Sequence, residues 1–346
     1  MGLANLIIFK AMKILLRSPN WIGDAVLSTS ALSYLREKVS EAHITVLAKD
    51  WVRDIFLHHP SVDKTISFNR VRVALIRDIR RAEYNTGILF TNSFSSAFPF
   101  FTARIKRRVG YDTNARGFLL TERIPVPEDL EKIHQRDYYL HLVRILVPGD
   151  EVPEAQLYLA REEEEKASSI LESVGIKGDR KIVGINPGAS YGPSKRWPQE
   201  KFASLARGII EKYKAEILIF GNRSEEKLGE VLIKGIEKDA VNLIGRTTLR
   251  ELMALVKRCS LFITNDTGPM HIASALNVPV VAIFGPTDPV RTSPLGVSTV
   301  IRKEVNCSPC RYRSCPLNHE CMERITVEEV LESTGKYLLT ENEDLC

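Results

Sequence analysis

The chain has 346 residues, the length of about two domains rather than one. Charged residues make up 26% and hydrophobic residues 44%, a globular composition that excludes disorder and collagen-like structure. The formal net charge of +5 suits an anionic substrate or an anionic membrane surface but is too small to indicate nucleic acid. No apolar run approaches the ~18 residues of a membrane-spanning helix.

The first eleven residues precede the first predicted strand. They lack a small-residue cleavage site after a long apolar core, so no signal peptide is expected, and Leu6 breaks the myristoylation pattern. One interpretation is an unstructured extension with the true start at Met12; the other is a short interfacial anchor on residues 6–9. The small apolar area favours the extension. Without an export signal, a cytoplasmic protein is expected.

Short apolar runs alternate with segments of helical periodicity, first in one series and then in another. The predicted strands of the first series are 13–17, 44–48 and 86–90, with a helix at 24–38. The second series has strands at 182–186, 216–220, 240–244, 261–265 and 279–284, with helices at 199–213 and 248–258. This alternation predicts parallel sheets with helices on both faces.

A charged run at 161–181 separates the two series and predicts a solvated helix ending near Gly175. We therefore expect an α/β protein with an N-terminal domain of residues 1–165 and a C-terminal domain of residues 166–346. A last helix within 326–339 could pack across either domain, the first included. Two doubly wound domains that face each other create a central cleft, and ligands bind at the carboxyl ends of such strands.

Residues 17–24, Arg-Ser-Pro-Asn-Trp-Ile-Gly-Asp, join the first strand to the first helix. Gly23 permits a tight turn or a close backbone approach. Asp24 is either a helix N-cap, which stabilises by ~1 kcal/mol, or a general base at the mouth of the cleft. The loop matches neither a P-loop nor G-x-G-x-x-G, which weakens any nicotinamide-dependent alternative.

A basic stretch follows the third predicted strand. Its five cations lie within thirteen residues: Arg104, Lys106, Arg107, Arg108 and Arg116. Arginine binds carboxylate and phosphate groups bidentately, and the polar segment 91–98 nearby suits hydroxyl recognition. The stretch is therefore either a site for an anionic, hydroxylated acceptor or a plain basic surface.

Two loops of the second series could hold a diphosphate. One, at 186–198, combines Gly188, Ser190 and Lys195 in an anion-binding loop. In the other, Asp266, Thr267 and Gly268 lead into a helix whose N-terminus favours negative charge, with His271 close to its start. No two aspartates are separated by a single residue, so helix N–H groups and cations must neutralise a diphosphate without an Asp-x-Asp metal site.

Four cysteines and a histidine cluster near the C-terminus, as Cys307-x2-Cys310-x4-Cys315-x5-Cys321 with His319 between the last two. Their spacing permits a zinc site with four cysteines, or with three cysteines and the histidine. Disulfides and free thiols are the other two interpretations.

Five segments together resemble the ADP-heptose:lipopolysaccharide heptosyltransferases, the type II members most of all: 12–24, 186–198, 220–226, 264–276 and 284–289. The resemblance extends from residue 12 to about 335. It implies a GT-B fold of two doubly wound Rossmann-like domains, the C-terminal one holding the ADP-sugar and the N-terminal one presenting a lipid-linked acceptor. It also implies an inverting, metal-independent reaction with no cofactor.

The resemblance assigns roles residue by residue. Asp24 would be the catalytic carboxylate and Lys195 the lysine that contacts the diphosphate. The donor site would include Glu225 or Glu226 at the ribose, and the block of Asp266, Thr267, Gly268 and His271. Arginines 104–116 would face the Kdo carboxylates and phosphates of the inner core; the members expected to bind the acceptor are Arg104, Arg107, Arg108 and Arg116.

The implied function is transfer of L-glycero-D-manno-heptose from ADP-heptose to a heptose of the lipopolysaccharide inner core. The alternatives are a type I or type III heptosyltransferase, a related enzyme with another donor or acceptor, and a non-catalytic protein that keeps the fold. Expected partners are ADP-heptose and a Kdo- and heptose-bearing lipid A, with no nucleic acid. A lipid acceptor also implies transient contact with the inner face of the inner membrane, where the cytoplasmic protein would be peripheral.

Overall fold

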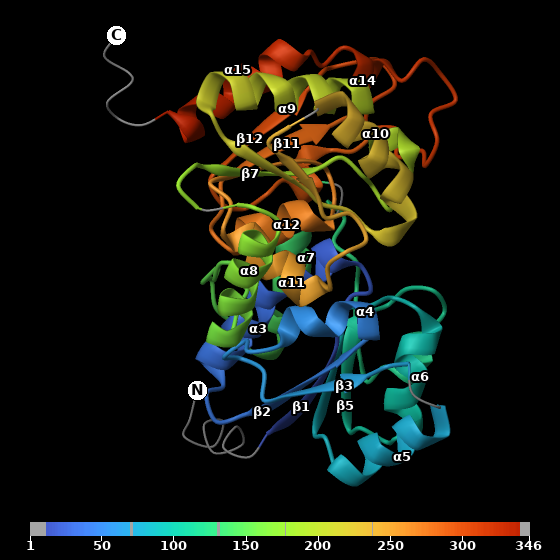
Figure 1. Cartoon of the computed structure of the whole chain (residues 1–346). Coiled ribbons are helices and arrows are strands. Elements are labelled where there is room, and N and C mark those ends of the chain that lie inside the picture. Colours follow the sequence, from blue (N-terminus) through green and yellow to red (C-terminus); the bar gives the residue numbers. More distant parts are fainter. Residues whose placement is uncertain (1–11, 70–71, 130–131, 177, 237, 340–346) are drawn as a thin grey trace. The chain divides into compact units, whose positions relative to one another are not determined.

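The computed structural model describes residues 12–69, 72–129, 132–176, 178–236 and 238–339 (Figure 1). The chain divides into two compact units between Tyr158 and Leu159. The boundary expected between 165 and 166 falls inside helix α8 (Arg161–Ser173), which belongs to the second unit. Both interpretations of residues 1–11 lie outside the described residues.

The first unit is built on a six-stranded parallel sheet in the order β3-β2-β1-β4-β5-β6. Its strands are β1 (Lys13–Arg17), β2 (His43–Ala48), β3 (Lys64–Ser67), β4 (Thr86–Leu89), β5 (Arg107–Tyr111) and β6 (Glu122–Ile124). Its helices are α2 (Ile22–Leu27), α3 (Thr29–Lys38), α4 (Asp50–Arg53), α5 (Arg72–Ala82), α6 (Phe94–Thr102) and α7 (Gln135–Leu146). The helix predicted at 24–38 is thus divided at Ser28, and part of the loop predicted at 91–98 is helical.

The second unit repeats this plan in the order β12-β11-β10-β7-β8-β9, again with parallel neighbours. Its strands are β7 (Ile182–Asn186), β8 (Glu216–Ile219), β9 (Ala240–Asn242), β10 (Leu261–Asn265), β11 (Val280–Phe284) and β12 (Ser298–Arg302). Its helices after α8 are α9 (Gln199–Tyr213), α10 (Glu226–Ile236), α11 (Leu249–Lys257), α12 (Gly268–Ala275), α13 (Pro289–Thr292), α14 (Glu320–Glu323) and α15 (Val327–Leu338).

Burial explains why the apolar runs became strands. Every residue of β7, β10 and β11 is buried, as expected for parallel strands covered by helices on both faces. The last helix, α15, packs against α9 of its own unit, because Val330 and Leu338 join the core of the second unit. The predicted pair of doubly wound parallel sheets is confirmed.

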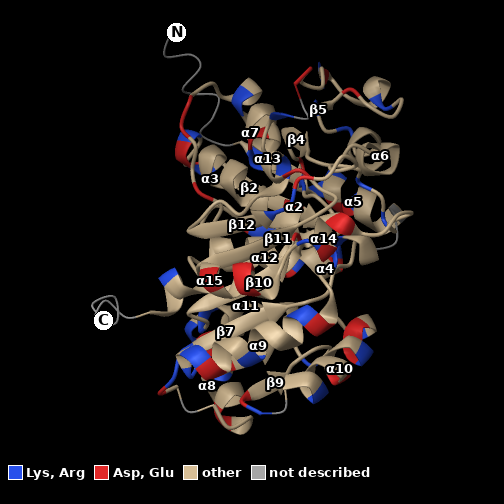
Figure 2. Cartoon of the chain, turned by 90° about the horizontal axis from the view of Figure 1, so that it is seen from above, with Lys and Arg blue, Asp and Glu red and all other residues tan. Residues whose placement is uncertain are grey.

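The charged run that opens the second unit is held by ion pairs. Arg250 of α11 donates to Glu163 of α8 (2.7 Å from Nε to Oε1), and Lys257 lies 2.6 Å from Glu164. Figure 2, with acidic residues red and basic residues blue, shows how densely α8 is charged. These contacts explain why α8 belongs to the second unit from its first turn.

The strand order places a switch point in each sheet. In the first unit it lies between β1 and β4, and in the second between β7 and β10, where successive connections leave in opposite directions. The loops after these strands therefore lie where ligands bind.

Across the described ranges we find no helix with the length and hydropathy to cross a bilayer.

Burial of His59 predicts a pH-dependent stability. Its Nδ1 accepts the Ser61 N–H (3.1 Å), and burial lowers its pKa to about 4. The unfolded chain binds a proton at this position below about pH 6.5, whereas the folded chain does not until about pH 4. The free energy of unfolding should therefore fall by roughly 3 kcal/mol as the pH falls through this interval.

Urea unfolding of His59→Gln near neutral pH and near pH 4 would measure this contribution. The variant should lose less stability on acidification than the wild type. His43→Gln is the control, because His43 is exposed. If both variants lose as much free energy of unfolding on acidification as the wild type, burial of His59 does not cause the pH dependence.

Candidate functional site

The loop after β1 is fixed from below by a buried arginine. Arg17 donates to Asn20 Oδ1 (2.6 Å) and Leu47 O (3.3 Å), and its guanidinium lies 4.1 Å from the centre of the Phe68 ring. Burial lowers the pKa of Arg17 to about 10, which still leaves it charged at neutral pH. The loop that carries Asp24 is therefore anchored at its root.

Asp24 lies in the first turn of α2, and Trp21 rather than Asp24 is the N-cap residue. The N-cap interpretation of Asp24 is therefore wrong. A carboxylate in a first turn is favoured by the helix dipole. The Tyr139 hydroxyl, from α7, donates a hydrogen bond to the Asp24 carboxylate. Burial is the largest cause that raises the pKa of Tyr139, and the negative charge of Asp24 is the next. Asp24 is half-buried, so its carboxylate is oriented at the carboxyl edge of the sheet.

The four arginines expected to bind the acceptor do not lie together. Arg116 is buried: its N–H groups donate to Thr91 O, to Tyr111 O (3.0 and 2.9 Å) and to Asn92 Oδ1 (3.2 Å). Burial lowers the pKa of Arg116 to about 10. This guanidinium holds the loops after β4 and β5 together at the same sheet edge as Asp24.

The other three arginines lie at or before the start of β5. Arg107 forms a two-pronged ion pair with Glu122 (2.5 and 3.1 Å), and Arg108 donates to Leu119 O (2.7 Å) and Ile105 O. Arg104 is exposed in the turn after α6. Asp24 follows the end of β1, which runs parallel to β5, so Arg104 and Arg107 lie near the opposite, amino edge of the sheet.

In the second unit, the loops after β7 and β10 meet at the switch point. Lys195 Nζ lies 2.5 Å from Asp266 Oδ2, which also accepts the Thr287 hydroxyl (2.7 Å). Both partners of the pair are largely buried. The Lys195 ammonium also lies 5.0 Å from the centre of the Tyr191 ring. Lys195 is thus held at one position beside the start of α12.

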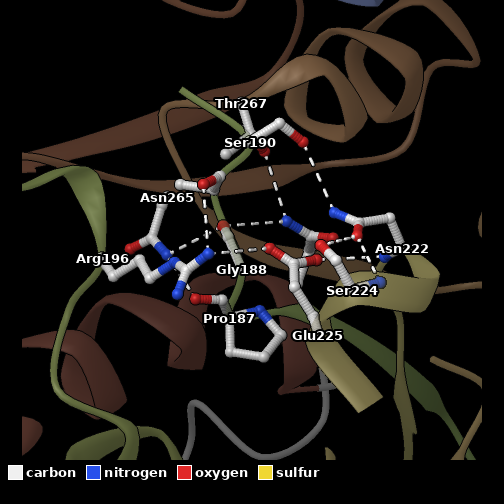
Figure 3. A network of polar contacts seen from close by, with 11 residues as sticks. Pro187, Gly188, Ser190, Arg196, Asn222, Ser224, Glu225, Asn265 and Thr267 are labelled. Carbon is white, nitrogen blue, oxygen red and sulfur yellow. Dashed lines mark hydrogen bonds and ion pairs between the residues drawn. The ribbon is translucent and has the colours of Figure 1, made fainter. Parts of the chain in front are cut away.

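The side chain of Asn265 ties the two loops to each other. Its Nδ2 donates to Pro187 O (2.8 Å) and Gly188 O (3.2 Å), and its Oδ1 accepts the Trp197 N–H (3.0 Å). Both ends of the Lys195 loop are thereby bonded to one amide. Figure 3 shows Asn265 with Pro187 and Gly188 in this network.

The start of α12 completes the predicted anion site. Thr267 is the N-cap residue with extended backbone, and its hydroxyl lies 3.3 Å from Asn186 Nδ2. Gly268 and Pro269 are the first two residues of the helix. His271, the fourth residue of the helix, is buried. The first N–H groups of a helix attract anions, so a phosphate group can bind beside Lys195.

The two candidate glutamates have different surroundings. Glu225 is buried, accepts the Asn222 N–H (3.0 Å) and lies 3.5 Å from Arg196 (Figure 3). Gly188 packs so closely on Glu225 that a Cβ at position 188 would overlap its carboxylate. Glu226 is exposed and pairs with Arg223 at 3.6 Å. Ser190 lies 3.5 Å from Asn222 in the same network as Glu225.

The cysteine segment supports the Lys195 loop. Arg313 O accepts the Ser194 N–H (3.1 Å), Arg311 O accepts the Tyr191 hydroxyl (2.6 Å), and His319 Nε2 lies 2.6 Å from Ser194 O. A Cβ at Gly192 would overlap the Arg313 carbonyl. This support was not predicted, because these partners lie more than a hundred residues apart along the chain.

The clustered cysteines are free thiols in the structure: Cys307, Cys310, Cys315 and Cys321. Burial, and after it the neighbouring thiols, raise the pKa of Cys321 to about 11. In the part of the chain that the structure describes, no three His, Cys, Asp or Glu side chains are arranged to hold a metal ion.

Known proteins match this chain in sequence and in fold. Residues 72–320 match the family described as Glycosyltransferase family 9 (heptosyltransferase). Lipooligosaccharide heptosyltransferase 2 of Haemophilus ducreyi is 33% identical, with 94% of this chain and 99% of that protein covered. Lipopolysaccharide heptosyltransferase 2 of Escherichia coli K12 is 30% identical, with 95% and 99% covered.

A solved structure described as E. coli ADP-heptose lps heptosyltransferase II superposes on this chain with a TM-score of 0.84. The superposition covers 96% of this chain and 100% of that one, at 28% identity. This similarity confirms the predicted GT-B fold class, with its two Rossmann-like domains.

Proposed function

The chain belongs to glycosyltransferase family 9, the heptosyltransferases, and from this premise we propose that it carries out the type II reaction. In that reaction L-glycero-D-manno-heptose moves from ADP-heptose to a heptose of the lipopolysaccharide inner core. The observation that carries the proposal is similarity to heptosyltransferase 2 proteins along nearly the whole length of both chains.

For the donor, we propose the switch point of the second unit. The Lys195 ammonium and the N–H groups at the start of α12 converge where a diphosphate would lie. Since they are held in place before any ligand binds, they can stabilise the charge that grows on the departing ADP. Gly188, Ser190 and Glu225 lie in the adjoining network and suit the nucleoside; exposed Glu226 is the weaker candidate.

For the chemical step, we propose Asp24 as the general base. Its carboxylate accepts the proton of an acceptor hydroxyl while that oxygen bonds to the anomeric carbon. The bond from this carbon to the ADP oxygen breaks on the opposite face, so the configuration inverts. Tyr139 is a positioning residue, because its hydrogen bond orients Asp24.

For the acceptor, we propose the first unit, at the carboxyl edge of its sheet. The polar loops after β4 and β5 lie there beside Asp24, held by Arg116. Arg116 acts in this proposal through the loops that it shapes. The acceptor is lipid-linked, so the proposal includes a cytoplasmic enzyme in transient contact with the inner face of the inner membrane.

The proposal is tested by ADP release from ADP-L-glycero-D-manno-heptose with two acceptors, Kdo-lipid A without heptose and the same acceptor bearing one heptose. Release with the heptose-bearing acceptor alone is expected. Release with the bare acceptor would make the protein a type I enzyme. No release with either, while ADP still binds, would leave the fold and refute both assignments.

Asp24→Asn should fold, bind ADP as before and turn over at least about a hundredfold more slowly, because the general base is lost. Steady-state rates and ADP titration calorimetry measure the two effects. Asp129→Asn is the matched control, since it removes the same charge from an exposed position. A rate near that of the wild type would remove Asp24 from the mechanism.

Lys195→Ala should weaken ADP binding by roughly ten- to a hundredfold, the range for a hydrogen bond to a charged group. The loss also leaves the Asp266 carboxylate without its cation, so the melting temperature should fall. Lys234→Ala, at an exposed position on α10, is the matched control. Unchanged affinity for ADP in Lys195→Ala would place the diphosphate elsewhere.

A further inference from the structure

The first unit has a hollow of about 520 Å³ that the proposed reaction does not use. Four of its lining residues are cations: Arg80, Arg104, Lys106 and Arg108. The others are Phe101, Thr102 and Ile105, so no carboxylate lines it. The composition of the hollow therefore suits an anionic ligand.

The hollow lies at the amino edge of the sheet. Helix α5 ends at Ala82 just before β4 begins, and α6 ends at Thr102 just before β5 begins. The lining residues come from these two helix ends and from the chain that enters β5. Asp24, in contrast, follows the carboxyl end of β1. The two sites thus lie at opposite edges of one sheet.

The segment that supplies the lining of the hollow is rich in positive charge. Segment 72–108 contains eight lysine and arginine residues and two carboxylates, a formal charge of +6. The whole chain carries +5, so the rest of it is slightly negative. Helix dipoles account for the arginines in the last turn of α5. They do not account for Lys106, which lies four residues after the end of α6 and is exposed.

An exposed aromatic ring accompanies the cations. Phe101 is 44% exposed, and the Arg108 guanidinium lies 5.5 Å from the centre of its ring. Val73, on α5, is exposed as well. A free phosphate ion needs only the cations. A bilayer surface engages both kinds of group, because headgroup phosphates attract the cations while the ring enters the interface.

We propose that this hollow and its rim are a docking surface for a bilayer containing anionic phospholipids. The exposed cations, Arg80, Arg104 and Lys106, bind headgroup phosphates and Phe101 inserts beside them. The purpose of docking rests on the proposed function, since a lipid-linked acceptor lies in a bilayer; the binding itself does not. Attachment through the amino edge leaves the opposite edge of this sheet, with Asp24, uncovered.

Co-sedimentation with vesicles tests the surface without donor or acceptor. The probes are phosphatidylcholine alone and phosphatidylcholine mixed with phosphatidylglycerol. The full chain should bind the mixed vesicles and not the neutral ones, and added salt should weaken binding. Binding to both equally, or to neither, overturns the proposal whether or not the protein transfers heptose.

Arg80→Gln with Lys106→Gln should lower the partition coefficient on mixed vesicles about 25-fold, since each cation near an anionic surface contributes roughly fivefold. Lys234→Gln with Lys238→Gln is the control of equal charge change in the second unit, and should lose much less. Phe101→Ser should weaken binding without changing its salt dependence. Melting temperatures establish that each variant is folded.

Three further results would overturn the proposal. An equal fall of the partition coefficient in the Lys234 and Lys238 double variant would show that binding depends on net charge alone. Displacement by inorganic phosphate at constant ionic strength would assign the hollow to a free anion. Loss of transfer to a soluble, deacylated acceptor in the Arg80 and Lys106 double variant would assign these cations to the acceptor.

Discussion

The Asn265 side chain is the contact on which the second unit's site depends. Its Nδ2 donates to the carbonyls at the start of the Lys195 loop and its Oδ1 accepts the N–H at the end, so the segment 187–197 is closed against β10. The Lys195–Asp266 pair can then form with largely buried partners. Asp266 is the next residue after Asn265. The end of β10 therefore determines both the shape of the Lys195 loop and the position of the Lys195 ammonium.

The first unit uses buried arginines for the same purpose. Arg17 lies beneath the Asp24 loop, and Arg116 lies beneath the loops after β4 and β5. The N–H groups of both side chains donate to backbone carbonyl and side-chain amide oxygens. Both carry charge in the interior, where desolvation lowers their pKa to about 10. The polar edge of this sheet is therefore rigid because cations lie under it, out of reach of a ligand.

The parts of the fold that carry a periodic apolar signal are predictable from the sequence. The fully buried strands β7, β10 and β11 were predicted, whereas β3, β5, β6 and β12 were not. β5 begins with two arginines that interrupt the apolar run, and β12 is only half-buried along its length. The loops after β1, β7 and β10 were predictable because each combines glycine or proline with a charged residue at a strand end.

The surroundings of the site residues were less predictable. Tyr139 lies 115 residues after Asp24, and no local pattern links the two. The sequence shows that lysine and arginine cluster in the basic stretch. It does not show that Arg116 is buried while Lys106 is exposed. That difference depends on the path of the chain between β5 and β6. The spacing of the cysteine segment draws attention to its thiols, yet its backbone carbonyls make the contacts with the Lys195 loop.

The strand order of the first unit has a consequence for synthesis. Among the described strands of its sheet β1 comes first in the sequence, yet it lies between β2 and β4 in the middle of the sheet. Its apolar residues gain their second neighbour only when residues 86–89 have left the ribosome. Until then one edge of β1, whose central residues 14–16 are apolar, is unpaired and open to other nascent chains. A nascent chain that ends before β4 therefore exposes a strand edge that only a later segment of the first unit can cover.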